Sequence, residues 1–303
     1  MGGIFAQPPC FRVRRLPSSP SPANGARMTA HKSGDPTTLN RLYGRAKGKP
    51  LRAFQQSLVD DLLPQIAVPE EGPVTAERLF GDSRPLHFEI GFGGGEHMAT
   101  RADMLPDHGF IGCEPFLNGV AAALAHVHGD AQKPGIPNVR IHHGDALDVL
   151  ARIPDGTLSF VYLLHPDPWP KARHAKRRMM NKGPVDLISA KLKPGGEFRF
   201  GTDHPVYLRW ALMVMNGRED FEWLCEKPQD FLKRPGGWPE TRYEAKARKQ
   251  GHEVWYFRYR KRSLDVSLCS IRLSGTNQTS ATATKKTMPN NGAKKAATIK
   301  PAI

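Results

Sequence analysis

A chain of 303 residues, 39% of them hydrophobic, can bury an ordinary core in one large α/β domain or two small ones. Its 44 Lys and Arg residues exceed its 29 Asp and Glu residues, and the net charge of +15 favours a polyanionic partner, nucleic acid ahead of an anionic membrane. The four cysteines form no Cys-x-x-Cys pair and no stretch reaches the ~18 apolar residues of a membrane span, so we expect a soluble cytoplasmic protein without a metal site.

The two ends of the chain differ in composition from its centre. Residues 1–34 lack Asp and Glu but carry four arginines among many Pro and Ser residues, which predicts a disordered basic extension over residues 1–38. A mitochondrial-type presequence, or a true start at Met28, is the alternative. Residues 263–303 are rich in Thr, Ser, Asn, Ala and Lys and are predicted to be a low-complexity tail. One domain over residues 39–262 remains between them.

Short apolar or β-branched runs that close on Gly, Pro or an acidic residue alternate with helical patterns through this domain. The runs are residues 86–92, 109–115, 138–145, 158–168 and 196–203. Such alternation predicts right-handed βαβ units and a parallel sheet. "FEWLCE" and "EVWYFRYRKR" follow and predict an antiparallel edge hairpin, with a short non-helical stretch between its strands. The whole is typical of an α/β class I methyltransferase, which has a seven-stranded, mostly parallel, Rossmann-like sheet with helices on both faces.

The loop after the first predicted strand, "FEIGFGGGEH", distinguishes between two cofactors. The dinucleotide pattern G-x-G-x-x-G fails because Glu96 stands at its third glycine. The pattern acidic-x-G-x-G-x-G is complete in Glu89, Gly91, Gly93 and Gly95. S-adenosylmethionine carries an ammonium and a sulfonium and no phosphate, so an acid at the strand end suits it. A glycine-rich turn without any ligand is the structural alternative.

Acidic residues also close the next two predicted strands. Glu114 follows "GFIGC" where a carboxylate typically accepts both ribose hydroxyls of an adenosine, and Asp145 follows "HHG", in reach of an adenine amino group. The carboxyl ends of adjacent parallel strands share one crevice. We therefore expect Glu89, Glu114 and Asp145 to face one ligand.

The fourth predicted strand ends in "HPDPWPK", where the methyl acceptor should arrive. Its three prolines are expected to hold His165, Asp167 and Trp169 in extended geometry. A carboxylate accepts two hydrogen bonds side by side, and guanine alone presents N1–H next to N2–H₂. Asp167 is thus predicted to position guanine and offset charge, because N7 has no proton for a base to remove. Trp169 is interpreted as either a stacking ring or a packing residue.

A basic run, "KARHAKRR", follows at once. A charge run of this kind is usually a solvated face. Beside a predicted base-binding loop it is better interpreted as a phosphate-binding segment. The candidate residues are Lys171, Arg173, Lys176, Arg177 and Arg178.

Several motifs in register resemble the bacterial tRNA (guanine-N7)-methyltransferases over residues 39–261. They are "FEIGFGGGEH", "GCEPFLNGV", "HPDPWPKARHAKRR", "FGTDHPVY" and "TRYEAKARKQGHEVW". The resemblance implies transfer of a methyl group from S-adenosylmethionine to the guanine at position 46, in the variable loop of tRNA. It also implies that Glu89, Glu114 and Asp145 contact the cofactor and that Asp167 contacts both cofactor and substrate.

The same resemblance implies a substrate-binding set, which consists of Lys171, Asp203, Thr241, Arg242, Tyr243 and Glu244. Asp203 ends the fifth predicted strand and should line the same mouth. Residues 241–244 combine a hydroxyl, a cation, a ring and an acceptor, which suits an extruded purine. An ordinary loop before an edge strand is the alternative for these four residues.

Two other functions compete with the methyltransferase. A non-catalytic RNA-binding protein on the same fold should have lost the cofactor acids, and they are present here. A nicotinamide oxidoreductase is disfavoured by Glu96. Transfer RNA is the expected partner, and the sequence leaves monomer and homodimer open.

Overall fold

The protein was analysed as a computed structural model that describes residues 48–130 and 132–263. The predicted extension, residues 1–38, and the predicted tail beyond residue 263 lie outside these ranges. Within them, no helix has both the length and the apolar character that crossing a bilayer requires.

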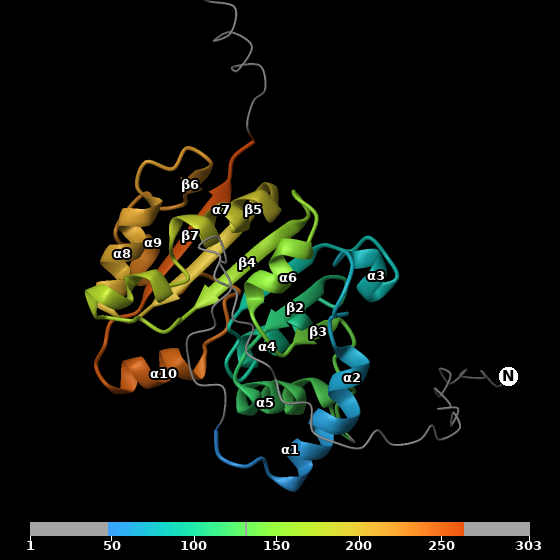
Figure 1. Cartoon of the computed structure of the whole chain (residues 1–303). Helices are drawn as coiled ribbons and strands as arrows, with labels where there is room; N and C mark the ends of the chain where they lie inside the picture. The colour runs from blue at the N-terminus through green and yellow to red at the C-terminus, as the bar shows by residue number, and fades with distance from the viewer. Residues whose placement is uncertain (1–47, 131, 264–303) are drawn as a thin grey trace, which may run out of the picture. The chain divides into compact units, whose positions relative to one another are not determined.

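Seven strands form one sheet in the order β3-β2-β1-β4-β5-β7-β6 (Figure 1). Strands β1 to β5 are parallel, whereas β7 runs antiparallel to both β5 and β6. This confirms the predicted class I methyltransferase sheet. The strand bounds are Leu86–Ile90 (β1), Gly109–Cys113 (β2), Val139–His142 (β3), Leu158–Leu164 (β4), Leu192–Thr202 (β5), Phe221–Trp223 (β6) and Trp255–Lys261 (β7).

Helices cover both faces of the sheet. The first face packs against α3 (Ala76–Phe80), α6 (Ala146–Arg152), α7 (Lys182–Lys191) and α8 (Pro205–Met215). The second face packs against α4 (Glu96–Met104) and α5 (Leu117–His128). The N-terminal segment joins this second layer as α1 (Ala53–Ser57), the π-helical turn η1 (Leu58–Leu62) and α2 (Leu63–Ile66).

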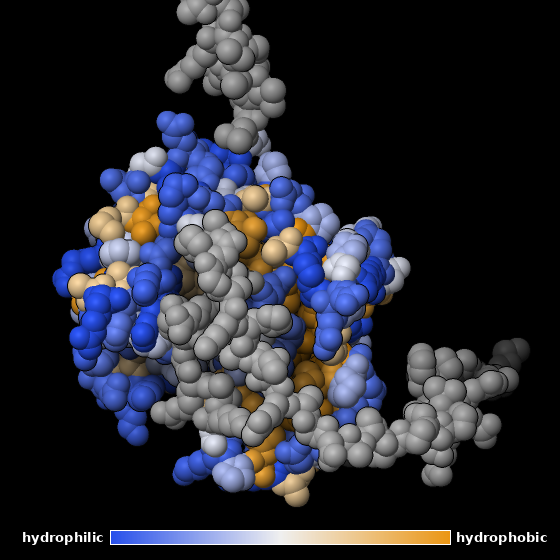
Figure 2. Space-filling model, viewed as in Figure 1, coloured by the Kyte–Doolittle hydropathy of each residue, from blue (hydrophilic) through white to orange (hydrophobic). Residues whose placement is uncertain are grey.

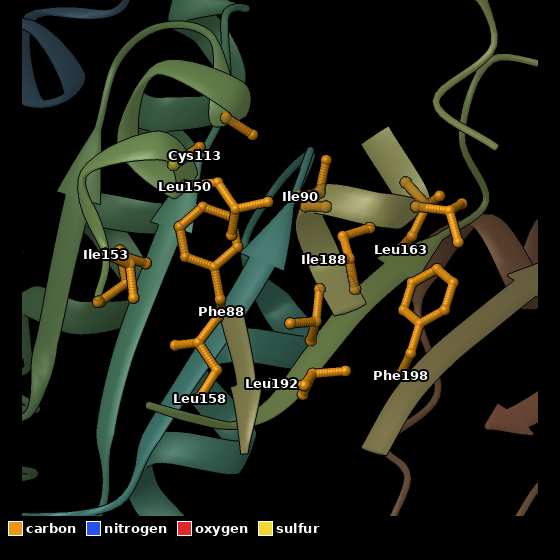
Figure 3. Packing of buried hydrophobic residues seen from close by; sticks show 14 of the residues in the cluster. Phe88, Ile90, Cys113, Leu150, Ile153, Leu158, Leu163, Ile188, Leu192 and Phe198 are labelled. Atoms are coloured by element: carbon orange, nitrogen blue, oxygen red, sulfur yellow. The ribbon is translucent and has the colours of Figure 1, made fainter. Parts of the chain in front are cut away.

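The first face of the sheet carries the largest apolar cluster. Phe88 and Ile90 alternate with polar residues along β1 and lie in this cluster, because successive side chains of a strand point to opposite faces. Phe88 is fully buried and packs in the same cluster as Leu150 and Leu158 (Figure 3). The alternation fixes which residues of β1 point toward the other face.

The second face is different at its centre, where β1, β4 and β5 present polar and aromatic side chains. His87 and Glu89 lie on this face of β1, and Tyr162 and Arg199 lie beside them. A small cluster around Tyr162, Trp238 and Tyr256 completes this layer. Part of this cluster comes from residues 224–254, which connect β6 to β7. We call this connection the insert.

The insert corrects one expectation from the sequence. The strands β6 and β7 do pair antiparallel, but the connection is not a short non-helical stretch. It contains α9 (Gln229–Leu232) and α10 (Arg242–Lys249). The helical pattern was hidden because α9 is a single turn and α10 is so polar that few apolar positions mark its buried side.

Candidate functional site

The three predicted cofactor acids lie at the carboxyl ends of neighbouring strands. Glu89 is in β1, whose neighbours are β2 and β4. Glu114 directly follows β2, and its backbone N–H donates to the carbonyl of His142 at the end of β3. Asp145 begins α6 just after β3. The strands therefore bring the three acids to one edge of the sheet, as predicted. All three residues are at least nine-tenths buried.

Glu114 organises the glycine loop. Its carboxylate accepts hydrogen bonds from the backbone N–H of Gly93, at 2.8 Å, and of Phe116, at 2.9 Å. Gly91, Gly93 and Gly95 have φ of 68°, 60° and 79°, a region that residues with a Cβ rarely adopt. The loop conformation therefore depends both on its glycines and on the acid of the next strand.

The ionisation of these acids reflects their burial. Burial raises the pKa of Glu114, and the nearby charge of Asp167 raises it further, while the two backbone N–H donors lower it. Burial also raises the pKa of Asp145, against the effect of the Leu147 N–H that it caps at 2.9 Å. Burial and the backbone donors therefore act on the pKa of each of these acids in opposite directions.

The proline loop after β4 differs from the extended geometry that was expected. Asp167 is exposed, but His165 and Trp169 have φ of 49° and 41°. Positive φ is costly for residues with a Cβ and persists only where surrounding contacts impose it. The prediction of extended His165 and Trp169 was wrong because it considered the prolines and not the tertiary contacts.

Arg178 supplies one of those contacts. Its Nε donates to the carbonyl of Pro168 at 3.1 Å and its Nη2 to the carbonyl of Trp169 at 2.8 Å. The guanidinium also lies 4.5 Å from the ring centre of Trp210 in α8. Only 4% of Arg178 is exposed, so a phosphate cannot reach it. We correct its predicted role from phosphate binding to bracing the proline loop.

The other cations of the basic run lie around a turn of 3-10 helix, η2 (Ala172–Arg177). Lys171, Arg173 and Lys176 are exposed. Arg177 lies 4.8 Å from the ring centre of Trp169, which also meets the His174 ring edge-on. Trp169 therefore packs within its own loop, whereas Lys171, Arg173 and Lys176 present their charge to solvent.

Asp203 follows β5 and lies beside the proline loop. Its carboxylate is 3.5 Å from His165 Nδ1 and 3.7 Å from His252 Nδ1. The His165 ring lowers the pKa of Asp203, while partial burial acts in the opposite direction. The structure therefore brings Asp203 next to the loop after β4, as predicted.

Residues 241–244 form the first turn of α10, so the ordinary-loop alternative is wrong. Thr241 caps the helix by accepting from the Glu244 N–H at 3.0 Å. Glu244 is fully buried, accepts from Arg248 Nη2 at 2.7 Å, and accepts from the Tyr256 hydroxyl. Two members of the predicted substrate set thus have structural contacts inside the protein.

The other two residues of this turn approach the glycine loop. A Cβ on Gly93 would lie 2.9 Å from Tyr243 Cε2, so the Tyr243 ring is in close contact with the loop. Arg242 Nε lies 3.5 Å from a carboxylate oxygen of Glu96, at the start of α4. Both side chains are partly exposed, and hydrophilic residues surround α10 on the visible face (Figure 2). The insert therefore closes over the predicted cofactor loop.

Sequence reasoning missed the structural roles of Arg178 and Glu244. One arginine among five cations carries no distinguishing pattern. Only the Thr-x-x-Glu spacing of Thr241 and Glu244 resembles a capping box and could have signalled a helix start.

Comparison with known proteins adds two findings. The model of the family described as "Putative methyltransferase" matches residues 83–257. A tRNA (guanine-N(7)-)-methyltransferase of Sphingopyxis alaskensis is 80% identical over 237 residues, which cover 78% of this chain and 100% of that protein. Proteins of the same name from Novosphingobium aromaticivorans and Rhodospirillum rubrum are 79% and 43% identical, covering 78% and 75% of this chain and 100% and 90% of those proteins.

Proposed function

This chain belongs to the tRNA (guanine-N(7)-)-methyltransferase family, and we propose that it transfers a methyl group from S-adenosylmethionine to N7 of guanine in tRNA. The observation that carries the proposal is that the glycine loop and the proline loop follow β1 and β4, which are paired neighbours in the sheet. The buried Glu114 carboxylate holds the glycine loop, and Arg178 braces the proline loop, which carries the exposed carboxylate of Asp167.

The residues around the glycine loop fit S-adenosylmethionine by their chemistry. Glu89, Glu114 and Asp145 offer anionic acceptors at adjacent strand ends, which suits a cationic ligand with ribose and adenine donors. Positive φ at the glycines lets the backbone approach such a ligand closely. When bound, the cofactor supplies an electrophilic methyl group on its sulfonium.

The proline loop is suited to orient the acceptor base. Asp167 can accept from N1–H and N2–H₂ of guanine together, which leaves the N7 edge free. Because N7 attacks with a lone pair and releases no proton, the loop contributes alignment and exclusion of water. The Arg178 brace holds the loop before substrate arrives, so less ordering accompanies binding.

The direct test combines unmodified tRNA, labelled S-adenosylmethionine and the purified protein, followed by mapping of 7-methylguanosine. We expect the label at N7 of the variable-loop guanine, position 46. A folded protein that labels no tRNA would contradict the enzymatic function. Label at another guanine would contradict the position only.

The exposed cations of the basic run are expected to bind the tRNA backbone. Replacing Arg173 and Lys176 by Ala together should lower tRNA affinity and reduce the salt slope of binding by roughly 1 per cation. Arg178→Ala is the contrasting variant, since its side chain is buried against the proline loop. It should lower turnover while leaving the salt slope unchanged. Filter binding across a salt series would contradict this assignment if Arg178→Ala flattened the slope as much as the double variant.

The contact between Tyr243 and the glycine loop predicts a graded effect of alanine substitutions. Gly93→Ala adds a Cβ 2.9 Å from the Tyr243 ring at φ of 60°, and should raise the KM for S-adenosylmethionine by about tenfold. Gly91→Ala is the matched control, because its φ is 68° but its Cβ would meet no atom of the described residues within 4 Å. It should raise the KM less. Equal effects in steady-state kinetics would show that the Tyr243 contact is unimportant.

A further inference from the structure

His97 is a buried histidine next to the proposed cofactor acid Glu89. It lies in the first turn of α4, immediately after the glycine loop. Its ring is 2% exposed, and its Nδ1 lies 2.7 Å from Glu89 Oε2. A carboxylate can only accept hydrogen bonds, so the ring nitrogen donates.

The ring of His97 is fixed from two sides. It meets the Tyr162 ring of β4 edge-on, with 4.8 Å between ring centres, and it lies 6.4 Å from the ring of Trp238 in the insert. Its other nitrogen, Nε2, is buried without a hydrogen-bond partner among the described residues. The hydrogen bond to Glu89 therefore uses the one ring nitrogen of His97 that has a partner in the described residues.

Glu89 needs such a partner, since it lies on the polar face of the sheet and is 5% exposed. A buried carboxylate is costly without a hydrogen-bond donor, and His97 is the side chain whose hydrogen bond to Glu89 the structure shows. The hydrogen bond from Nδ1 occupies one carboxylate oxygen and fixes the orientation of the group. The second oxygen is then held in one place for a ligand.

We propose that His97 is a positioning residue that orients the Glu89 carboxylate toward the amino group of S-adenosylmethionine. This rests on the proposed function, because it assumes that Glu89 contacts the cofactor. His97 does not touch the reacting atoms. Its effect is therefore confined to cofactor binding and does not extend to the binding of tRNA.

The test compares two substitutions at His97 by steady-state kinetics with each substrate varied. His97→Leu removes the donor and keeps an apolar side chain, and should raise the KM for S-adenosylmethionine about tenfold while the KM for tRNA stays near that of the wild type. His97→Asn keeps an N–H donor at the position of Nδ1, and should restore most of the affinity. His97→Gln, whose amide lies one bond further out, serves in place of His97→Leu if that protein does not fold.

His87 is the matched control. It lies two residues before Glu89 on the same face of β1 and is 1% exposed, but its ring nitrogens lie 3.0 Å from the Tyr162 hydroxyl and 2.8 Å from His108 Nδ1. Burial, followed by the charge of His108, lowers the pKa of His87 to about 2, so the His87 ring is neutral. His87→Leu should lower the melting temperature and leave the KM for S-adenosylmethionine unchanged.

Three results would overturn the positioning role. They are a wild-type KM for S-adenosylmethionine in His97→Leu, equal impairment in His97→Asn and His97→Leu, and an equal rise in His87→Leu. In each case the KM of the variant is compared with that of a wild-type protein that methylates tRNA. Absence of methylation by the wild type would instead contradict the proposed function, so the two failures are distinguishable.

Discussion

Replacing Asp167 by Ala is expected to lower kcat/KM for methyl transfer to tRNA by about 10³-fold. The carboxylate is exposed on a loop whose backbone is held by Arg178, and it is the acid on that loop that can receive the Watson–Crick edge of guanine. Asp167→Asn should be almost as impaired, because its amide N–H₂ would face the N1–H and N2–H₂ donors of the base. Single-turnover kinetics with saturating S-adenosylmethionine measures this directly.

Two controls separate positioning from general binding. The affinity for tRNA should fall little in Asp167→Ala, because phosphate contacts supply most of it. Asp103→Asn removes an exposed carboxylate on α4 that pairs with Lys133, away from the proline loop, and should turn over like the wild type. A normal rate in Asp167→Ala would show that this carboxylate does not orient guanine.

Replacing Glu244 by Ala is expected to reduce the free energy of unfolding by about 2 kcal/mol and to abolish activity indirectly. The side chain is fully buried and joins Arg248 to the Tyr256 hydroxyl. Arg248 is half exposed, so water can partly replace the lost carboxylate as its partner. The Tyr256 hydroxyl, in contrast, loses its acceptor. Urea unfolding followed by circular dichroism measures the change in stability.

Glu240 provides the matched comparison. It lies 3.5 Å from Arg248 Nη1, but its own side chain is 41% exposed. Glu240→Ala should change stability by less than about 0.5 kcal/mol. If Glu244→Ala instead lost activity with unchanged stability, Glu244 would be a direct substrate contact, as the family resemblance implies.

The sequence predicted the sheet and the edge where the acids meet, because both follow from local patterns. Alternating apolar residues in β1 and acids after β2 and β3 are properties of short segments. The antiparallel pairing of β6 and β7 at the edge of the sheet was also predicted. These features need no knowledge of which side chains meet across the fold.

The sequence could not predict which members of a polar group face inward. Arg178 and Arg173 are both cations in one run, yet Arg178 is buried by the carbonyls of the proline loop and by Trp210. Likewise, Glu244 and Tyr243 are adjacent in sequence, yet Glu244 is fully buried and Tyr243 is partly exposed against the glycine loop. Tertiary contacts decide these cases, and they also impose the positive φ of His165 and Trp169.

The unequal faces of the sheet have a consequence for local opening. The large apolar cluster covers the first face of the sheet. On the second face, the insert packs against the small cluster around Tyr162 and Trp238 and against charged side chains. Amide hydrogens of α10 should therefore exchange through partial unfolding that leaves β1 and β4 protected. The glycine loop and α10 then belong to two cooperative units, so the loop can remain folded while the helix that carries Arg242 and Tyr243 opens.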